Sequence, residues 1–283
     1  MKYSSWVILL AIFLFVFDFI IWEEIVFSES DKNSKIYFLN VGQGDSELVV
    51  LPNNVKVLID GGPDNKVLNE LSQNISSYDR YIDLVILSHA QLDHFGGLIR
   101  VVKNYKIGAF IFNGRNGTSA AYKDLENEIK QNKIPVITLS QNDKINYLDN
   151  KFEILSPSKK LLEDKNLNNT VLVIKFTGNN ESVLFTGDIG KNIEDDLIGS
   201  GNLKSDILKV AHHGSKYSSA QEFLDFVSPK ISVIEVGKNS YGHPNPSVLN
   251  RLKEVNSRIF RTDINGTVKI ELSASKLNIF SQR

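Results

Sequence analysis

The feature that most constrains this sequence is a recurring short apolar run of strand length that ends in a polar side chain, which in three of four cases lies beside a glycine. The runs are VKVLID before Gly61, DLVILSH, SVLFTGD, and DILKVAHH before Gly214. Apolar runs of about four to eight residues are typical of strands that are buried on both faces. The pattern therefore favours an α/β fold in which polar side chains gather where buried strands end.

Short β-branched runs and amphipathic stretches alternate over the rest of the chain. Strands are expected over 35–41, 46–52, 55–60, 83–88, 107–112, 135–139, 170–176, 182–188, 206–211 and 231–237, and helices over 67–75, 97–105, 121–131, 192–199, 221–227 and 246–253. Consecutive strands at the start of each half indicate hairpins, and three more strands are expected from Arg258 onward. We expect two sheets packed face to face with helices outside, an αββα sandwich. A doubly wound parallel sheet is the alternative that the pattern leaves open.

The first 33 residues are expected to lie outside that fold. Residues 6–22 carry one charge, Asp18, over about 17 residues, which is near the lower limit for crossing a bilayer. We expect a single membrane anchor, because no small-residue cleavage site follows; a cleaved signal sequence and a buried helix are the alternatives. The predicted domains are an anchor or signal segment with a polar linker over 1–33, and a single large domain over 34–283.

The charges that flank the apolar run predict its orientation. Lys2 precedes the run, whereas Glu23, Glu24, Glu29 and Asp31 follow it. The positive-inside tendency then places the rest of the chain outside the cytoplasm, anchored to the membrane or secreted if the segment is cleaved.

Cysteine is absent, and Lys+Arg 32 against Asp+Glu 33 gives a net charge of -1. The absence of cysteine excludes disulfide frameworks, thiolate zinc sites and cysteine nucleophiles. The near-neutral charge excludes the basic surface of a dedicated nucleic-acid binder. Any metal must therefore be held by histidine and oxygen ligands, and any contact with nucleic acid must be local.

All five histidines lie in three short segments bounded by glycine or proline. They are His89 and His94 in SHAQLDHFGG, His212 and His213 in KVAHHGS, and His243 in YGHPNP. One histidine at a strand end is more often a hydrogen-bonded polar residue than a metal ligand, but the confinement of all five to three loops favours ligands. Asp93 precedes His94 at a strand-to-helix turn, where imidazole and carboxylate groups can converge on a cation.

Two further aspartates stand at strand ends. Asp188 follows Gly187, where glycine permits a sharp turn that points the carboxylate into a cavity; a helix N-cap is an equally good interpretation. Asp60 precedes Gly61, and it either supports a metal site or belongs to a hairpin turn. Together these strand ends predict a metal site that is built from separate segments.

The ordered motifs FLNVGQGDS, VLIDGG, LSHAQLDHFGGL, NNTVLV, VLFTGD, LKVAHHGS and GHP resemble those of the metallo-β-lactamase-fold hydrolases. The likeness is to the competence (DNA-uptake) branch, the hydrolase domain of ComEC-type proteins, without their multi-span channel region. It extends from Lys35 to the carboxyl terminus. The resemblance implies an αββα sandwich whose active site lies at one edge between the two sheets.

The resemblance also implies a set of metal ligands, which are His89, Gln91, Asp93, His94, Asp188 and His212. Four of them, Asp93, His94, Asp188 and His212, would form one complete site, with His213 as the less favoured choice for its last member. The other site would keep His89 and share Asp188.

This other site departs from the family pattern. Gln91 stands where relatives have His or Asp, Asn40 stands where Asp is usual, and Asn169 stands where the wider family has a histidine ligand. Amide groups bind divalent ions weakly compared with imidazole or carboxylate. We therefore expect one or two divalent ions, zinc or manganese, with the second ion weakly held.

These residues predict a metal-dependent hydrolase of phosphoester bonds, a nuclease or phosphodiesterase, that uses a metal-activated water. The expected catalytic residues are Asp93, which would orient the water, and His243, which would bind the phosphate or protonate the leaving group. The residues expected to support the ligands or bind substrate are Asp60, Asn169, Lys209, His213 and Ser215, together with the backbone amides of Gly96 and Gly97. For Lys209, a strand lysine that faces solvent is an equally good interpretation.

Two other functions remain open at this point. The first is a degenerate binding or scaffold module of the same fold with little or no catalysis, which Gln91 and the asparagines suggest. The second is β-lactam hydrolysis, since a fold does not fix a substrate. The expected partners are a phosphoester substrate, DNA included, and a membrane through the N-terminal segment; the sequence indicates no protein partner.

Overall fold

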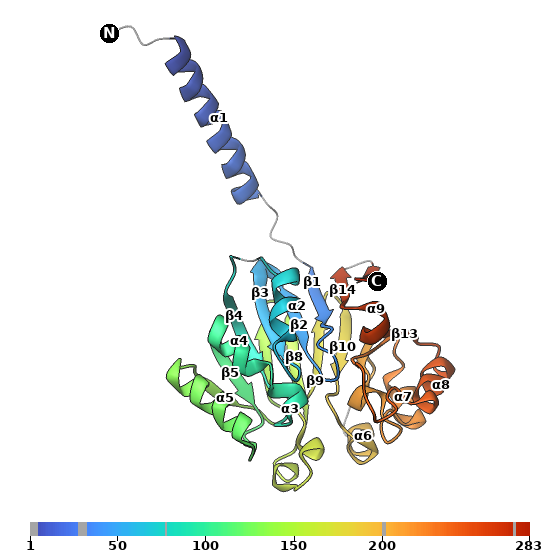
Figure 1. Cartoon of the computed structure of the whole chain (residues 1–283). Helices are drawn as coiled ribbons and strands as arrows, with labels where there is room; N and C mark the ends of the chain where they lie inside the picture. Colours follow the sequence, from blue (N-terminus) through green and yellow to red (C-terminus); the bar gives the residue numbers. More distant parts are fainter. Residues whose placement is uncertain (1–4, 28–32, 77, 200–201, 274–275) are drawn as a thin grey trace.

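The computed structural model of the chain describes residues 5–27, 33–76, 78–199, 202–273 and 276–283, and in the first helix it describes the side chains of residues 5–19. Two sheets pack against each other, and helices cover their outer sides (Figure 1). The architecture is the expected αββα sandwich. A doubly wound parallel sheet is excluded, because each sheet contains antiparallel neighbours.

Within the described residues, the first sheet has eight strands in the order β15-β14-β1-β2-β3-β4-β5-β6. They are β1 (Ser34–Phe38), β2 (Glu47–Leu51), β3 (Val55–Ile59), β4 (Tyr81–Ile86), β5 (Lys106–Phe112), β6 (Val136–Thr138), β14 (Val268–Ser273) and β15 (Lys276–Ser281). Neighbours are antiparallel from β15 to β3 and parallel from β3 to β6. The expected run of three hairpin-connected strands at the start of the body is thereby confirmed.

In the same part of the chain, the second sheet has seven strands in the order β13-β12-β11-β10-β9-β8-β7. They are β7 (Lys144–Tyr147), β8 (Asn150–Ser156), β9 (Val173–Gly178), β10 (Glu181–Phe185), β11 (Ile207–Lys209), β12 (Ile231–Ile234) and β13 (Arg258–Arg261). Strands β10 to β13 are parallel, and β7 to β10 are antiparallel. The predicted hairpin of β9 and β10 is confirmed, whereas the hairpin of β7 and β8 was not expected.

Three apolar layers hold this arrangement together. The side chains of β1 alternate, so that Ile36 and Phe38 enter the core between the sheets while Tyr37 faces the helices. On the helices the apolar side chains recur at helical spacing, as Tyr122, Leu125 and Ile129 do. The outer layer of the first sheet contains α2 (Lys66–Asn74), α4 (Leu98–Asn104) and α5 (Ala120–Gln131), and that of the second contains α6 (Lys191–Ile198), α7 (Gln221–Val227) and α8 (Pro246–Glu254).

Short helical segments complete the connections. They are α3 (Leu92–Phe95), α9 (Thr262–Asn265) and the 3-10 turns η1 (Pro52–Asn54), η2 (Leu161–Glu163), η3 (Leu167–Thr170) and η4 (Ala211–Gly214). Two of them, α3 and η4, are the helical segments that come next in the chain after strands β4 and β11, and they lie at the edge where these strands end. This edge carries the polar residues that the sequence places at strand ends.

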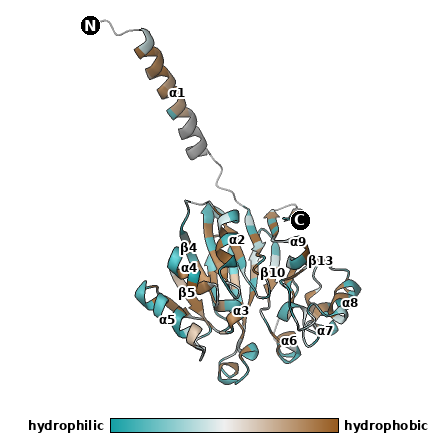
Figure 2. Cartoon of the chain, viewed as in Figure 1, coloured by the Kyte–Doolittle hydropathy of each residue, from teal (hydrophilic) through white to brown (hydrophobic). Residues whose placement is uncertain are grey.

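The N-terminal helix α1 (Ser5–Phe27) is longer than the predicted apolar run. Its described side chains are exposed and mostly apolar, as the brown colour in Figure 2 shows; Trp6, for example, is 80% exposed. Within the described part of the chain, no helix combines the length and the apolar character needed to cross a membrane, so the structure does not support the predicted anchor. Residues 28–32 of the predicted polar linker lie outside the described residues, and the domain boundary at residue 33 stays a prediction.

Candidate metal centre

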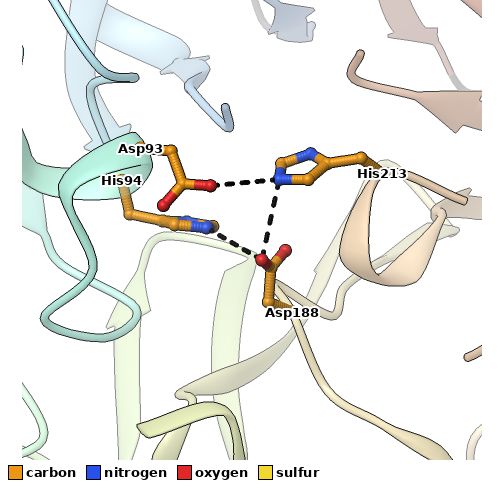
Figure 3. Close-up of side chains that lie close together, drawn as sticks. All are labelled: Asp93, His94, Asp188 and His213. Carbon is orange, nitrogen blue, oxygen red and sulfur yellow. Dashed lines mark ion pairs between the residues drawn. The ribbon is translucent and has the colours of Figure 1, made fainter. Parts of the chain in front are cut away.

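Four side chains from both sheets meet at the shared edge: Asp93, His94, Asp188 and His213 (Figure 3). Asp93 and His94 lie on α3 after β4, Asp188 follows β10, and His213 lies on η4 after β11. Each offers a ligand atom within 4.8 Å of the others. The carboxyl ends of strands from two sheets thus deliver two imidazoles and two carboxylates to one point.

The distances place Asp188 at the middle of this cluster. Its Oδ2 lies 3.4 Å from His94 Nε2 and 3.6 Å from His213 Nε2. His213 Nε2 also lies 3.4 Å from Asp93 Oδ2. Three of the side chains are at most 2% exposed, whereas that of Asp93 is 34% exposed, so Asp93 is the member that faces solvent.

The hydrogen bonds behind the cluster fix which nitrogen of each ring faces it. His94 Nδ1 lies 2.7 Å from Asp60 Oδ2, and His213 Nδ1 lies 2.9 Å from the Glu235 carbonyl oxygen. In both rings Nδ1 is therefore the nitrogen that faces a carboxylate or carbonyl oxygen, and Nε2 faces the cluster. The two Nε2 atoms are buried and have no hydrogen-bond partner, which is the state of a histidine prepared to bind a metal.

The charges of the cluster also fit a cation. Burial alone would lower the pKa of His94, but the charges of Asp188 and Asp60 outweigh it and hold this pKa well above its usual range. Burial would also lower the pKa of His213, but the charges of Asp188 and Asp45 outweigh it and raise this pKa to about 10. Both rings bind protons because the carboxylates around them leave excess negative charge. A divalent ion would satisfy that charge and the two unpartnered nitrogens together, so the residues present fit the metal that the sequence predicts.

His89 lies beside this cluster, with its ring centre 4.1 Å from that of His94. Its Nδ1 contacts Ser88 Oγ at 3.0 Å, and its buried Nε2 has no hydrogen-bond partner. Gln91 donates its side-chain N–H to Asn168 Oδ1 at 2.5 Å, which ties the amide to η3. Among the described residues, no group of three histidine or carboxylate ligands includes His89. The structure therefore leaves the predicted second site with one imidazole and an amide, and it makes the four-residue cluster the stronger site.

The choice between the adjacent histidines differs from the prediction. The structure groups His213, rather than His212, with the other three ligands. Both residues have a left-handed backbone, with φ of 50° and 54°, which turns the chain sharply so that His213 enters the site. The His212 side chain stays 31% exposed, with Nε2 at 3.7 Å from Asp188 Oδ2. His212 thus lies at the mouth of the site and His213 lies inside it.

The remaining predicted residues fall into different places. Asp60 lies directly behind His94, and it also binds the backbone N–H and hydroxyl of Ser88 at 2.7 and 2.5 Å. Asn169 does not reach the cluster, because its amide is bonded to Asp164 and Asn192; its neighbour Asn168 is the one that contacts Gln91. The structure thus gives Asp60 the supporting position that Asn169 lacks.

The residues that were predicted to contact substrate lie in different environments. Lys209 is fully buried and paired with Asp45, which excludes the interpretation of a solvent-facing strand lysine. His243 lies at the mouth, its ring centre 5.8 Å from that of His212, and burial followed by the charge of His212 lowers its pKa. Ser215, at the end of η4, is buried and accepts the Tyr217 N–H at 3.4 Å.

The predicted backbone donors of the glycine turn are already in use. The Gly97 N–H donates to the Gly62 carbonyl at 2.9 Å, and the Gly96 N–H donates to the Leu92 carbonyl at 2.8 Å. A Cβ at Gly97 would lie 2.0 Å from the Gly61 carbonyl oxygen, so this turn requires glycine for close packing of two loops. The glycines therefore position α3 rather than bind an anion.

Sequence reasoning missed the charged residues buried behind the cluster, which are Asp45, Glu47 and Glu235. Asp45 ends the glycine-rich segment VGQGD, and Glu235 follows the apolar strand β12 in the same way that Asp188 follows β10. The strand-end pattern of the sequence would have found Glu235, had it been applied to that strand.

Comparison with known proteins assigns the chain to a family. Residues 39–237 match the family model described as Metallo-beta-lactamase superfamily. ComE operon protein 3 of Bacillus subtilis (strain 168) is 29% identical over 257 residues, which cover 84% of this chain and 33% of that protein. Competence protein ComA of Neisseria gonorrhoeae is 30% identical over 246 residues, which cover 86% of this chain and 33% of that protein. The chain thus spans about a third of the length of these relatives.

A solved structure shows the same fold. The metallo-beta-lactamase fold protein YhfI from Bacillus subtilis has a TM-score of 0.57 at 12% sequence identity, and the likeness covers 85% of this chain and 100% of that chain. The sheets, the strand-end ligands and the family match agree with one another. The chain belongs to the metallo-beta-lactamase superfamily, and its relatives in sequence are competence proteins.

Proposed function

We propose that this protein is a metal-dependent hydrolase of phosphoester bonds, a phosphodiesterase or nuclease. The observation that carries the proposal is the cluster of Asp93, His94, Asp188 and His213, in which both imidazoles present an unpartnered Nε2 to two carboxylates. The phosphoester class is supported by the relatives, since competence is the uptake of DNA and a third relative is named Recombination protein 2.

The donor set of the cluster suits zinc or manganese. Two imidazoles and two carboxylates are ligands that zinc accepts, and carboxylate oxygens also suit manganese. When bound, a divalent ion at such a site lowers the pKa of a coordinated water and neutralises charge on a phosphoryl oxygen. We propose one ion at the cluster and a weaker second position beside His89.

The exposure of the other site residues indicates which of them would orient the water and which would bind the substrate. Asp93 is the ligand open to solvent, so its carboxylate is placed to accept a hydrogen bond from the attacking water and orient it. His243 lies at the mouth, and its lowered pKa makes it a neutral imidazole that can donate one N–H to a substrate oxygen. Lys216 follows Ser215 in the sequence, and its exposed side chain is our candidate to supply an ammonium for a phosphate.

A degenerate binding module is the second candidate, and one observation favours it: the Gln91 amide is bonded to Asn168 at a position where a stronger ligand would complete a second site. In this function the metal is structural or absent. The complete donor set of the four-residue cluster argues against it, so catalysis by a single ion is the better conclusion.

Turnover by the full-length chain tests the proposal. Metal-stripped protein is supplied with manganese or zinc and assayed on single-stranded DNA, duplex DNA, bis(p-nitrophenyl) phosphate and a β-lactam, with Asp188→Ala as the inactive control. We expect hydrolysis of a phosphodiester that requires the metal and disappears in Asp188→Ala. Metal binding without turnover would support the binding module, and turnover of the β-lactam alone would contradict the phosphoester class.

We also propose that the protein acts outside the cytoplasm, as the charges flanking the N-terminal apolar run predict. Protease added to intact cells should then digest the body of the protein, or the body should be found in the medium, while cytoplasmic controls stay whole. Protection of the body inside intact cells would reverse this orientation.

A further inference from the structure

Two charged residues that the proposed mechanism does not use lie buried directly behind the metal centre. Asp45 lies in the loop between β1 and β2 of the first sheet, and Lys209 is the last residue of β11 in the second sheet. Their side chains are 1% and 0% exposed, and they form an ion pair. The pair joins the two sheets at the edge where the ligands meet.

Asp45 contacts three of the four cluster residues. Its Oδ1 lies 3.2 Å from His213 Nδ1, and its Oδ2 lies 3.7 Å from His94 Nδ1. Its backbone N–H donates to the Asp93 carbonyl oxygen at 3.2 Å. Asp45 therefore faces the side of each ring that points away from the metal position.

Lys209 approaches the fourth cluster residue, Asp188, without forming a hydrogen bond to it. The ammonium donates to Asp45 Oδ2 and to the Gly187 carbonyl oxygen at 3.0 Å. Asp188 Oδ1 lies 3.9 Å from the same Nζ, beyond hydrogen-bond length, and it is buried with no hydrogen-bond partner. The ammonium is thus next to the central metal carboxylate, while its hydrogen bonds are committed to Asp45 and the backbone.

We infer that Asp45 is a positioning residue of the metal centre, which holds the Lys209 ammonium and so prevents it from forming a direct hydrogen bond to Asp188. The inference rests on the proposed metal centre and concerns how that centre stays open to a cation. A buried ammonium that loses its counter-ion is strongly destabilised and takes the next carboxylate within reach. Asp188 is that carboxylate, the only other one within 4.0 Å of Nζ among the described residues. An ammonium bound to Asp188 would compete with the metal for the same oxygens.

Three variants of the full chain separate this role from simple structural support. Asp45→Asn removes the charge and keeps the size of the side chain, Lys209→Met removes the ammonium, and the double variant removes both. We expect Asp45→Asn to weaken manganese binding at least about tenfold, and Lys209→Met to bind manganese no more weakly than wild type. The double variant should recover to within about threefold of wild type, because no competing cation remains.

Manganese affinity is measured by calorimetry and by the electron paramagnetic resonance signal of the free ion, so no readout depends on turnover. A double variant that binds manganese as weakly as Asp45→Asn would overturn the inference. Wild-type manganese affinity in Asp45→Asn would also overturn it, because Lys209 would then have moved to Glu47 or Glu235. Should Asp45→Asn fail to fold, Lys209→Met still decides: a tenfold loss of affinity in it contradicts competition by the ammonium.

The Lys56 and Asp79 pair is the matched control. Its Nζ and Oδ2 atoms are 2.8 Å apart, the Lys56 side chain is 3% exposed, and neither residue belongs to the cluster. Asp79→Asn and Lys56→Met should lower thermal stability and leave manganese affinity within twofold of wild type. Wild-type protein that binds no metal would contradict the proposed function itself, which is a different result from any change among the variants.

Discussion

The three buried imidazoles at the metal centre share one hydrogen-bond arrangement. In His89, His94 and His213, Nδ1 has a partner and Nε2 has none. The partners are a hydroxyl, a carboxylate and a backbone carbonyl from different segments of the chain, and each contacts Nδ1 and leaves Nε2 as the ring nitrogen without a hydrogen-bond partner. Among the described residues, His212 Nδ1 has no hydrogen-bond partner of this kind, and the side chain stays 31% exposed. The residues behind these three rings thus leave Nε2 as the nitrogen that a metal could bind.

Alanine substitution of each adjacent histidine tests this assignment. Loss of a residue that only supports a ligand lowers metal affinity by roughly 10- to 100-fold. We expect His213→Ala to lower it by more than this, because the substitution removes one of the four proposed ligands. His212→Ala should keep the metal stoichiometry of wild type and lower turnover, because His212 lies at the mouth. Equilibrium dialysis with manganese or zinc measures both. If His212→Ala lost the metal and His213→Ala kept it, His212 would be the ligand.

Substitution of Gln91 tests the weaker position beside His89. A carboxylate at position 91 cannot donate to Asn168 and adds a charged ligand next to an unpartnered imidazole nitrogen. Gln91→Asp and Gln91→His should therefore bind a second ion more tightly than wild type, and turnover at limiting metal should rise. Titration of manganese and zinc into metal-stripped protein measures the stoichiometry. Equal affinity in all three proteins would show that position 91 does not face a metal.

The sequence predicts three members of the cluster together, since Asp93, His94 and Asp188 each follow an apolar strand. The fourth member could not be chosen from the sequence, because His212 and His213 are adjacent and two left-handed backbone conformations decide which one enters. Asp45 was not predicted because its partner Lys209 lies 164 residues away, and only the packing of the two sheets brings them together.

The alternation of strand-like and helix-like segments in the sequence predicted most strands and helices of the sandwich, but not the hairpin of β7 and β8. In that hairpin the turn contains Leu148 with a φ of 50°, a conformation that favours glycine or asparagine, so the turn carries no sequence signal. Strand β8 alternates between buried and half-buried residues as an edge-region strand should, but β7 is short and partly exposed. Tertiary pairing with β8 and β9 therefore defines an element that local propensity leaves undetermined.

A buried carboxyl group connects two helices of the second outer layer. Glu194 on α6 accepts hydrogen bonds from the backbone N–H groups of Ser219 and Ala220, where α7 begins, with the second bond at 2.9 Å. Burial raises the pKa of Glu194 to about 7 against the effect of these hydrogen bonds. Between the usual glutamate pKa and pH 7, the folded state therefore holds a proton that the unfolded chain has released.

This proton predicts the sign of a pH effect. The free energy of unfolding should fall as the pH rises from about 4.5 to about 7, by up to roughly 3 kcal/mol from Glu194, and then level off. Glu194→Gln cannot ionise, so its stability should depend less steeply on pH in this window. Urea unfolding at several pH values measures the slope, with Glu222→Gln on the exposed side of α7 as the control. The same slope in Glu194→Gln and wild type would contradict this role for Glu194.

The whole molecule depends on contacts between the two ends of the body. Strand β14 from the carboxyl end pairs with β1, with Ile270 opposite Ile36, and both enter the core between the sheets. The four cluster residues come from both sheets, so the metal position exists only when the sheets are packed. Sequence patterning predicted this two-sheet class, whereas the pairing of distant strands required the structure.

Removal of the N-terminal segment tests whether the body is complete without it. The first strand begins at Ser34, whose hydroxyl donates to Asn150 Oδ1 at 2.8 Å, and the residues of all three core clusters lie after position 33. Deletion of residues 1–33 should therefore leave cooperative thermal unfolding and metal stoichiometry unchanged, as circular dichroism and metal analysis would show. Deletion of residues 1–39 is the matched control, because it also removes Ile36 and Phe38, both fully buried between the sheets, and it should abolish folding. Loss of cooperative unfolding in the shorter deletion would mean that α1 belongs to the folded body.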